Sequence, residues 1–156
     1  MKITLLLLGA TDKGWISDGL KTYSDRLRHY CSFEIKEIPQ LKGAAALDKE
    51  QIKAREGELI LKCVRAEDCV VLMDERGEQY TSLQWASKIQ SYMNSGRNLV
   101  FVIGGAYGFS PQVYGRADVK ISLSRMTFSH QMVRIIFTEQ LYRAFTILNN
   151  EPYHHE

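Results

Sequence analysis

The sequence predicts an α/β fold, with a mainly parallel sheet that has helices on both faces. Short apolar stretches alternate along the chain with segments in which apolar residues recur at helical spacing. The central stretches are apolar at nearly every position, as in strands that are buried on both faces. Within the 156 residues no internal repeat, low-complexity tract or linker is visible, so a single domain over 1–156 is expected.

Two strands, each followed by a helix, are expected in the first half of the chain. The leucine-rich opening run ends at Gly9, and Phe33–Ile38 alternates apolar with charged residues until Pro39 stops it. Asp48 is the expected N-cap of the second helix. The expected elements are a strand over 2–9, a helix over about 13–29, a strand over 33–38, a loop over 40–46 and a helix over about 48–63.

The second half continues the alternation and ends in the longest helix. Continuous apolar runs at Cys69–Met73 and Leu99–Ile103 predict buried strands, and the charged stretch after the first run predicts a turn. The expected elements are a strand over 69–73, a polar turn over 74–78, a helix over 82–93, a strand over 99–103, a strand over 119–123 and a helix over about 130–148.

Composition and charge exclude several classes of protein. The apolar run Ile3–Leu8 is too short to span a bilayer and lacks a small-residue cleavage site, so a cytoplasmic protein without membrane contact is expected. Cys31, Cys63 and Cys69 include no Cys-x-x-Cys pair, which predicts buried free thiols and no metal site. The formal net charge of +2 comes without a basic arm, so composition alone does not indicate a nucleic-acid partner.

A glycine-rich turn, Ile103–Gly108, is the first candidate for a binding site. Ligands of open α/β sheets bind outside the carboxyl ends of strands, and Gly104 and Gly105 allow the backbone to approach a ligand closely. A tight turn that needs positive φ is the structural alternative. The stretch does not match G-x-G-x-x-G, and the chain has no P-loop and no His-Glu-x-x-His, which argues against NAD binding, ATP hydrolysis and zinc proteolysis.

The segment Ile121–His130 is the second candidate. A strand leads there into a loop of apolar side chains and free backbone groups, followed by a helix whose cap is Thr127 or Ser129. Such a loop suits an adenine ring, which needs stacking and a few backbone hydrogen bonds. An ordinary connection between a strand and a helix is the alternative.

The terminal helix carries polar residues on two opposite stripes and apolar residues on both flanks. Glu139, Arg143 and Thr146 share one stripe, and Arg134 and Thr138 lie on the opposite side. Because two apolar flanks need two packing surfaces, we expect this helix to pack on its own sheet and on the second subunit of a homodimer. A central helix of a larger core is the alternative. Taken alone, the tail over 149–156 indicates a frayed terminus.

Segments distributed over nearly the whole chain together carry a family resemblance. They are Met1–Ile3, Lys53-x-x-Glu56-Gly57, Phe101–Gly105, Ser122–Ser124, Met126–Phe128, His130-x-x-Val133-Arg134, Glu139–Ala144 and Pro152–His154. In this order they resemble the RlmH type of the SPOUT (α/β-knot) methyltransferases. The C-terminal half is highly specific as a set, although no single piece of it is.

The resemblance implies a homodimeric enzyme that uses S-adenosylmethionine to methylate N3 of a pseudouridine in 23S ribosomal RNA of the assembled ribosome. It also implies a deep trefoil knot in the C-terminal third, which holds the cofactor. Ser129 stands where proline is commoner in the family, and Tyr107 lies inside the glycine turn. The cofactor contacts implied by position are Met73, Gly104, Gly105, Leu123, Ser124, Arg125, Met126, Thr127 and Phe128.

Methylation at N3 removes the proton of an imide nitrogen, so a base or a group that stabilises the anion is useful. His154, Arg143 and His130 are the catalytic candidates, since imidazole accepts a proton near neutral pH and guanidinium stabilises charge on a carbonyl oxygen. Tyr153, His154 and Arg134 are the candidates for substrate contact. Each basic candidate also has a structural alternative, such as a helical ion pair for Arg143. The alternative function is a non-catalytic, ribosome-associated factor that binds a nucleotide or S-adenosylmethionine.

Overall fold

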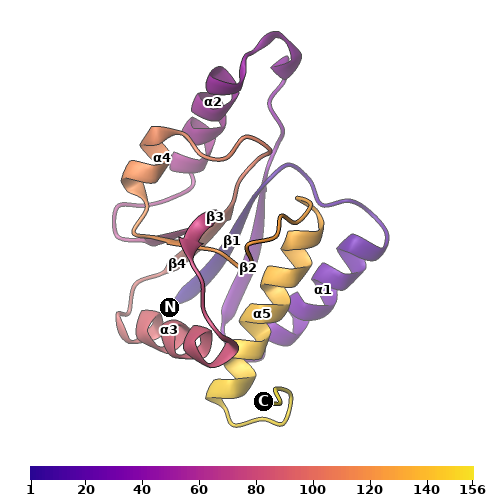
Figure 1. Ribbon diagram of the computed structural model, residues 1–156, viewed down its shortest axis with the longest axis vertical. Coiled ribbons are helices and arrows are strands. Elements are labelled where there is room, and N and C mark those ends of the chain that lie inside the picture. The colour runs from indigo at the N-terminus through magenta and orange to yellow at the C-terminus, as the bar shows by residue number, and fades with distance from the viewer.

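Every neighbouring pair of strands in the five-stranded sheet runs parallel, in the order β2-β1-β4-β3-β5 (Figure 1). The computed structural model describes residues 1–156. The predicted α/β class with a parallel sheet is confirmed. The strands are β1 (Lys2–Leu8), β2 (Ser32–Ile38), β3 (Cys69–Glu78), β4 (Leu99–Ile103) and β5 (Val119–Ile121), and the helices are α1 (Trp15–Leu27), α2 (Lys49–Leu61), α3 (Ser82–Asn94), α4 (Pro111–Arg116) and α5 (Met132–Leu148), with a 3-10 turn at Ala44–Ala46.

Helices cover both faces of the sheet, because successive side chains of the central strands point to opposite faces and are buried on both. In β4, Leu99, Phe101 and Ile103 join the core that contains residues of α1, α3 and α5. Val100 and Val102 join a second core that contains residues of α2 and α4. Figure 1 shows α2 and α4 together on one side of the sheet and α1, α3 and α5 on the other. The continuous apolar runs therefore indicated strands with no solvated face.

Two helices begin at reciprocal side-chain caps. The carboxylate of Asp48 accepts a hydrogen bond from the N–H of Gln51 (2.8 Å), whose side chain accepts one from the N–H of Asp48 (3.0 Å). Thr81 and Gln84 form the same pair at the start of α3. The N-cap predicted at Asp48 is confirmed, and both caps satisfy donors that a helix start leaves free.

The polar turn predicted at 74–78 is wrong, because β3 continues through it to Glu78. After Met73 the pairing with β5 shifts register, so that Met73 and Glu78 both pair with Ile121. Gly77 permits this approach, since a Cβ there would lie 2.5 Å from the backbone carbonyl carbon of Ile121. Polar side chains indicate exposure, but they do not reveal the backbone pairing that keeps the segment extended.

Other boundaries differ by smaller amounts. The last strand ends at Ile121 instead of residue 123, and the terminal helix begins at Met132 instead of about residue 130. The short helix α4 is an addition to the predicted elements, although Ser110 followed by Pro111 is a helix-start pattern. The hydroxyl of Ser110 accepts a hydrogen bond from the N–H of Val113 (3.3 Å).

Candidate active site

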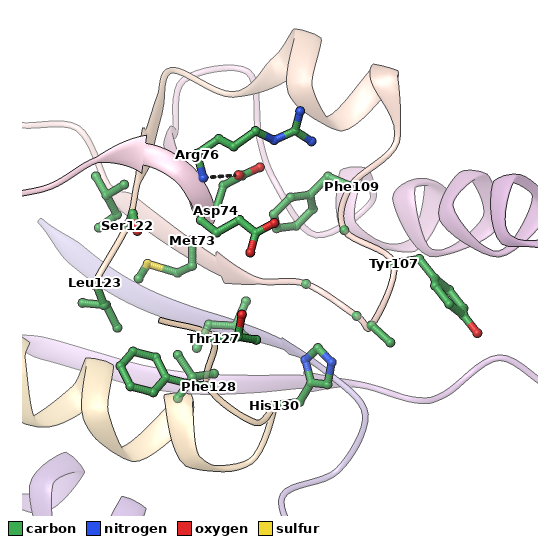
Figure 2. A pocket seen from close by; sticks show the side chains of 18 of the residues that line it. Met73, Asp74, Arg76, Tyr107, Phe109, Ser122, Leu123, Thr127, Phe128 and His130 are labelled. Carbon is green, nitrogen blue, oxygen red and sulfur yellow. Dashed lines mark hydrogen bonds between the residues drawn. The ribbon is translucent and has the colours of Figure 1, made fainter. Parts of the chain in front are cut away.

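A cavity of about 410 Å³ lies at the carboxyl ends of three adjacent strands, β4, β3 and β5 (Figure 2). Because these strands are parallel, the glycine turn after β4, the extension of β3 and the loop after β5 meet at the same edge. Residues of α2, α4 and the start of α5 complete the wall. Open α/β sheets bind ligands at such an edge.

All of the residues predicted to contact a cofactor, with the exception of Arg125, line this cavity. Arg125 belongs to the same loop, but its side chain is exposed. His130, one of the catalytic candidates, lines the cavity and is itself exposed. In Figure 2 it lies with Thr127 across the cavity from Asp74. The predicted cofactor residues that line it are Met73, Gly104, Gly105, Leu123, Ser124, Met126, Thr127 and Phe128.

The loop after β5 leaves most of its backbone polar groups unbonded. The hydroxyl of Ser122 donates to the carbonyl of Ser124, and the hydroxyl of Ser124 accepts from the N–H of Met126, both at 2.9 Å. No other hydrogen bond within the chain engages the backbone of 123–128. Apolar side chains beside free N–H and carbonyl groups suit a flat heteroaromatic ring, as predicted for this segment.

Side chains of the protein itself pack closely against the backbone of the glycine turn. A Cβ on Gly104 would lie 2.8 Å from the ring of Phe109, and a Cβ on Gly105 would lie 2.8 Å from the carboxylate of Glu56. Gly108 has a φ of 81°, in the left-handed region that favours glycine. The turn therefore needs positive φ, as the structural alternative supposed, and its glycines also form part of the cavity wall.

The extension of β3 adds a charged wall that the sequence reasoning missed. Asp74, Glu75 and Arg76 all line the cavity. The carboxylate of Asp74 accepts hydrogen bonds from the hydroxyl of Tyr114 and from the N–H of Arg76 (2.8 Å for the latter; Figure 2). Burial and the bond to Asp74 raise the pKa of Tyr114 to about 12. The available signal was the position of these residues directly after a strand, and the wrong turn prediction obscured it.

Arg134, a candidate for substrate contact, is buried and does not line the cavity. Its guanidinium donates to the carbonyls of Leu8 (2.9 Å), Gly9 (3.1 Å) and His130 (3.2 Å), and to the hydroxyl of Thr11 (2.9 Å). Burial lowers the pKa of Arg134. In this arrangement the side chain joins the end of β1 to the start of α5 and so positions the loop beside the cavity.

The N-cap of α5 is Gln131, so the prediction of Thr127 or Ser129 as the cap is wrong, but Ser129 still helps to fix the start of the helix. Its hydroxyl accepts a hydrogen bond from the N–H of Met132 (3.1 Å), and its carbonyl accepts one from the N–H of Val133 (3.0 Å). Thr127, the other predicted cap, makes no such bond and faces the cavity (Figure 2). The residue that departs from the family pattern therefore holds the first turn of the helix.

The tail packs on α5, away from the cavity. The hydroxyl of Tyr153 donates to Glu139 (3.0 Å), and Arg143 binds both Glu139 (2.6 Å) and Nδ1 of His154 (3.2 Å). The expected ion pair of Glu139 and Arg143 is therefore confirmed. Burial, then hydrogen bonds, raise the pKa of Tyr153. None of these four residues lines the cavity. A helix rises about 1.5 Å per residue, so Arg143 lies about 15 Å along α5 from the cavity residue Val133.

Both flanks of α5 are covered within the subunit. One side packs on α1, where Gly19 lies against Ile135, and the other side packs on α3. An outward stripe, which contains Met132, Ile136 and Gln140, remains half-buried or exposed. The apolar flanks alone therefore do not require a second subunit, and the outward stripe is the surface that α5 offers to one.

Three further observations concern the classes of protein considered from composition. Cys31, Cys63 and Cys69 are free thiols, as predicted, but only Cys69 is buried and the other two are half-buried. No three His, Cys, Asp or Glu side chains gather in a group that could hold a metal ion. No helix combines the length and the apolar character needed to cross a membrane.

Comparison with known proteins gives one consistent family. Residues 1–154 match the model of a family described as "Predicted SPOUT methyltransferase". A protein of Christiangramia forsetii named "Ribosomal RNA large subunit methyltransferase H" is 60% identical over 156 residues, which are 99% of each chain. Proteins of the same name from Parabacteroides distasonis and Flavobacterium johnsoniae are 52% and 49% identical over 100% of each chain. The resemblance seen in the sequence is confirmed: the chain belongs to the SPOUT methyltransferase family.

Proposed function

We propose that this protein transfers the methyl group of S-adenosylmethionine to N3 of a pseudouridine in 23S ribosomal RNA, as a cytoplasmic homodimer that acts on the assembled ribosome. The observation that carries the proposal is the cavity at the carboxyl ends of β4, β3 and β5, which is built from segments that mark the family. The name of the relatives supports ribosomal RNA of the large subunit as the methyl acceptor. The trefoil knot of the C-terminal third is part of the same proposal.

The cavity matches the size and chemistry of the proposed cofactor. Its volume of about 410 Å³ falls in the range of small-molecule sites, roughly 300–1,000 Å³. The loop Leu123–Phe128 offers apolar side chains and unbonded backbone groups to the adenine ring. Gly104 and Gly105 form part of the cavity wall, so that their backbone groups face the ribose. Arg76 and the two carboxylates beside it offer charged partners to the amino-acid end.

We assign the role of proton acceptor to His130, which lines the cavity. When bound, S-adenosylmethionine supplies a methyl group that its positive sulfur has already activated. The protein therefore has to hold N3 of the pseudouridine in line with that group and take up the N3 proton. The imidazole of His130 is exposed at the cavity wall, and imidazole accepts protons near neutral pH.

A substrate role for Tyr153 and His154 needs the tail of a second subunit. In their own subunit Tyr153 bonds Glu139 and His154 bonds Arg143, which lie about 9 Å and about 15 Å along α5 from the cavity residue Val133. A homodimer joined through the outward stripe of α5, with Met132 and Ile136 at its centre, brings the tail of one subunit to the cavity of the other. Tyr153 then stacks on a base of the RNA, as aromatic side chains do with unstacked nucleotides.

The contact with Arg143 determines which ring nitrogen of His154 accepts a hydrogen bond and which can donate one. A guanidinium has only donors, so Nδ1 of His154 accepts the hydrogen bond at 3.2 Å and the ring proton resides on Nε2. The Nε2–H group is then a donor. It is buried and lies 3.6 Å from the carboxylate of Glu156, so donation to a carbonyl oxygen beside N3 requires the end of the tail to move aside. We therefore assign His154 and Arg143 to stabilising the deprotonated imide and His130 to receiving its proton.

Mass spectrometry of 23S ribosomal RNA tests the proposal. Ribosomes from a deletion strain are incubated with the purified protein and S-adenosylmethionine, and calorimetry measures binding of the cofactor separately. We expect one methyl group on one pseudouridine and a single cofactor site per subunit. Cofactor binding without methylation would instead indicate the non-catalytic ribosome-associated factor. Absence of cofactor binding would contradict the proposed enzyme and leave only a factor that binds another nucleotide.

A further inference from the structure

A half-buried carboxyl group beneath the glycine turn has no part in the function proposed above. Glu56, in α2, lies directly against Gly105, with its two oxygens 2.8 and 2.9 Å from the position that a Cβ of Gly105 would occupy. Its Oε1 atom is buried and makes no hydrogen bond. Buried polar atoms in folded proteins are nearly always hydrogen-bonded, so an acceptor left unpaired at the back of a cavity wall needs an explanation.

The neighbouring turn carries unpaired donors. The N–H groups of Gly105, Ala106 and Tyr107 donate no hydrogen bond, and the one bond within the turn runs from the N–H of Gly108 to the carbonyl of Gly105 (3.2 Å). An acceptor without a donor and donors without an acceptor therefore occur at the same contact. Pairing them requires a movement of this glycine-rich turn, whose glycines permit a change of backbone conformation.

The turn stands between the cavity and α2. Its residues line the cavity on one side, whereas Glu56 does not line it. Behind the turn α2 is held close to the start of α4, since a Cβ on Gly57 would lie 2.4 Å from the hydroxyl oxygen of Ser110. The ammonium group of Lys49 lies 5.4 Å from the ring centre of Tyr107. Helix α2 is therefore a fixed support against which the turn can settle.

We propose that Glu56 is a positioning residue for the methyl donor: when the donor occupies the cavity, the turn settles on α2 and the carboxylate of Glu56 accepts hydrogen bonds from the N–H groups of Gly105 and Ala106. This inference rests on the proposed function, because it takes S-adenosylmethionine as the ligand of the cavity. Glu56 touches neither the donor nor the RNA and acts only through the turn. Burial raises the pKa of Glu56 in the unliganded protein, and new N–H bonds favour its ionised form.

Calorimetry with S-adenosylmethionine on the full-length protein tests the role of Glu56. The variants are Glu56→Leu, which removes the acceptor, Glu56→Gln, which keeps one acceptor oxygen, and Glu58→Leu, an exposed position on the same helix that serves as control. We expect Glu56→Leu to weaken binding about tenfold, as for the loss of a hydrogen bond to a charged group. Glu56→Gln should stay within about threefold of the unmodified protein, and Glu58→Leu should be unchanged. At saturating donor the kcat of all variants should agree within about twofold, with the change appearing in KM.

Hydrogen exchange of the turn separates this role from general support of the fold. Donor binding should protect the amides of Gly105 and Ala106 in the unmodified protein and in Glu56→Gln, but not in Glu56→Leu. Unchanged donor affinity in Glu56→Leu, or equal protection of these amides in all variants, would overturn the inference while leaving the proposed function intact. Failure of the unmodified protein to bind S-adenosylmethionine would instead contradict the proposed function, and the inference with it.

Discussion

Arg143 donates a hydrogen bond to Nδ1 of His154, at 3.2 Å, and this contact ties the C-terminal tail to the terminal helix. The same guanidinium lies over the ring of Tyr153, 4.8 Å from its centre, and binds the carboxylate of Glu139. The tail therefore belongs to a packed cluster and is not a free end. The cluster lies far along α5 from the cavity of its own subunit. A catalytic role for the tail therefore depends on how the two subunits of the proposed dimer are arranged.

Removal of the tail should separate cofactor binding from methyl transfer. Deleting 152–156 takes away groups proposed to contact RNA but none that line the cavity, so affinity for S-adenosylmethionine should stay within about twofold. Methyl transfer to ribosomes should fall by at least about a hundredfold, the usual effect of losing catalytic hydrogen-bond donors. Tyr153→Ala and His154→Ala measure stacking and donation separately. Full activity in the truncated protein would make the tail a purely structural end.

Mixing two inactive variants should restore activity if the tail of one subunit serves the cavity of the other. One variant lacks 152–156, and the other carries Gly104→Val in the cavity wall. In a mixed dimer, one cavity is intact and receives an intact tail, so methyl transfer should reappear on mixing and subunit exchange. Activity that stays absent in mixtures that contain mixed dimers would place tail and cavity in the same subunit.

Gly104→Val should abolish binding of S-adenosylmethionine while leaving the far-ultraviolet circular dichroism intact. The added side chain meets the ring of Phe109, 2.8 Å from the Cβ position, so either the ring or the turn has to move toward the cavity. Gly115→Ala, in α4, is the matched control, because a Cβ there meets no atom within 4 Å. Calorimetry on both variants measures the difference. Undiminished binding in Gly104→Val would remove the turn from the cofactor site.

Arg134→Met should destabilise the fold by about 3 kcal/mol, because buried carbonyl groups lose a charged hydrogen-bond donor. The affected acceptors include the carbonyls of Leu8 and Gly9, which have no other side-chain donor. Arg125→Met, at an exposed position, should change stability by less than about 0.5 kcal/mol. Urea unfolding compares the two. An Arg134→Met protein as stable as the control, yet defective in RNA binding, would return Arg134 to the role of substrate contact.

Ile136→Glu should produce monomers or aggregates in light scattering. The residue lies in the outward stripe of α5, so the substitution places a charge in the proposed subunit contact. Gln90→Glu, on the exposed side of α3, provides a control that adds the same charge elsewhere. A well-folded Ile136→Glu dimer would show that the outward stripe does not form the contact.

The sequence predicts best those features that local patterns encode. Apolar runs and the alternation of apolar with charged residues located every strand, and Asp48 was correctly predicted as the N-cap of the second helix. The extension of β3 escaped prediction because it depends on backbone pairing with Ile121, which side-chain polarity does not display.

The same distinction between local patterns and long-range packing applies to the residues of the candidate site. Most residues of the cavity were found because they follow strand ends or match the family. Asp74 also follows a predicted strand and was obscured by the wrong turn prediction, whereas the contact of Glu56 with Gly105 arises from the packing of distant segments. The burial of Arg134 likewise depends on contacts with Leu8 and Gly9, more than 120 residues away in the chain. The separation of the tail from the cavity is a property of the whole helix and has no local signature.

Methyl transfer to ribosomes from a deletion strain tests the central claim most directly. The purified protein and labelled S-adenosylmethionine are incubated with assembled ribosomes, with isolated large subunits and with naked 23S ribosomal RNA, and the modified nucleoside is identified by mass spectrometry. With a formal net charge of only +2, the protein has little general attraction to RNA, so shape on the ribosome should decide recognition. The account predicts one N3-methylated pseudouridine on assembled ribosomes and little or none on naked RNA. An unmodified ribosome after incubation with protein that binds the cofactor would contradict it.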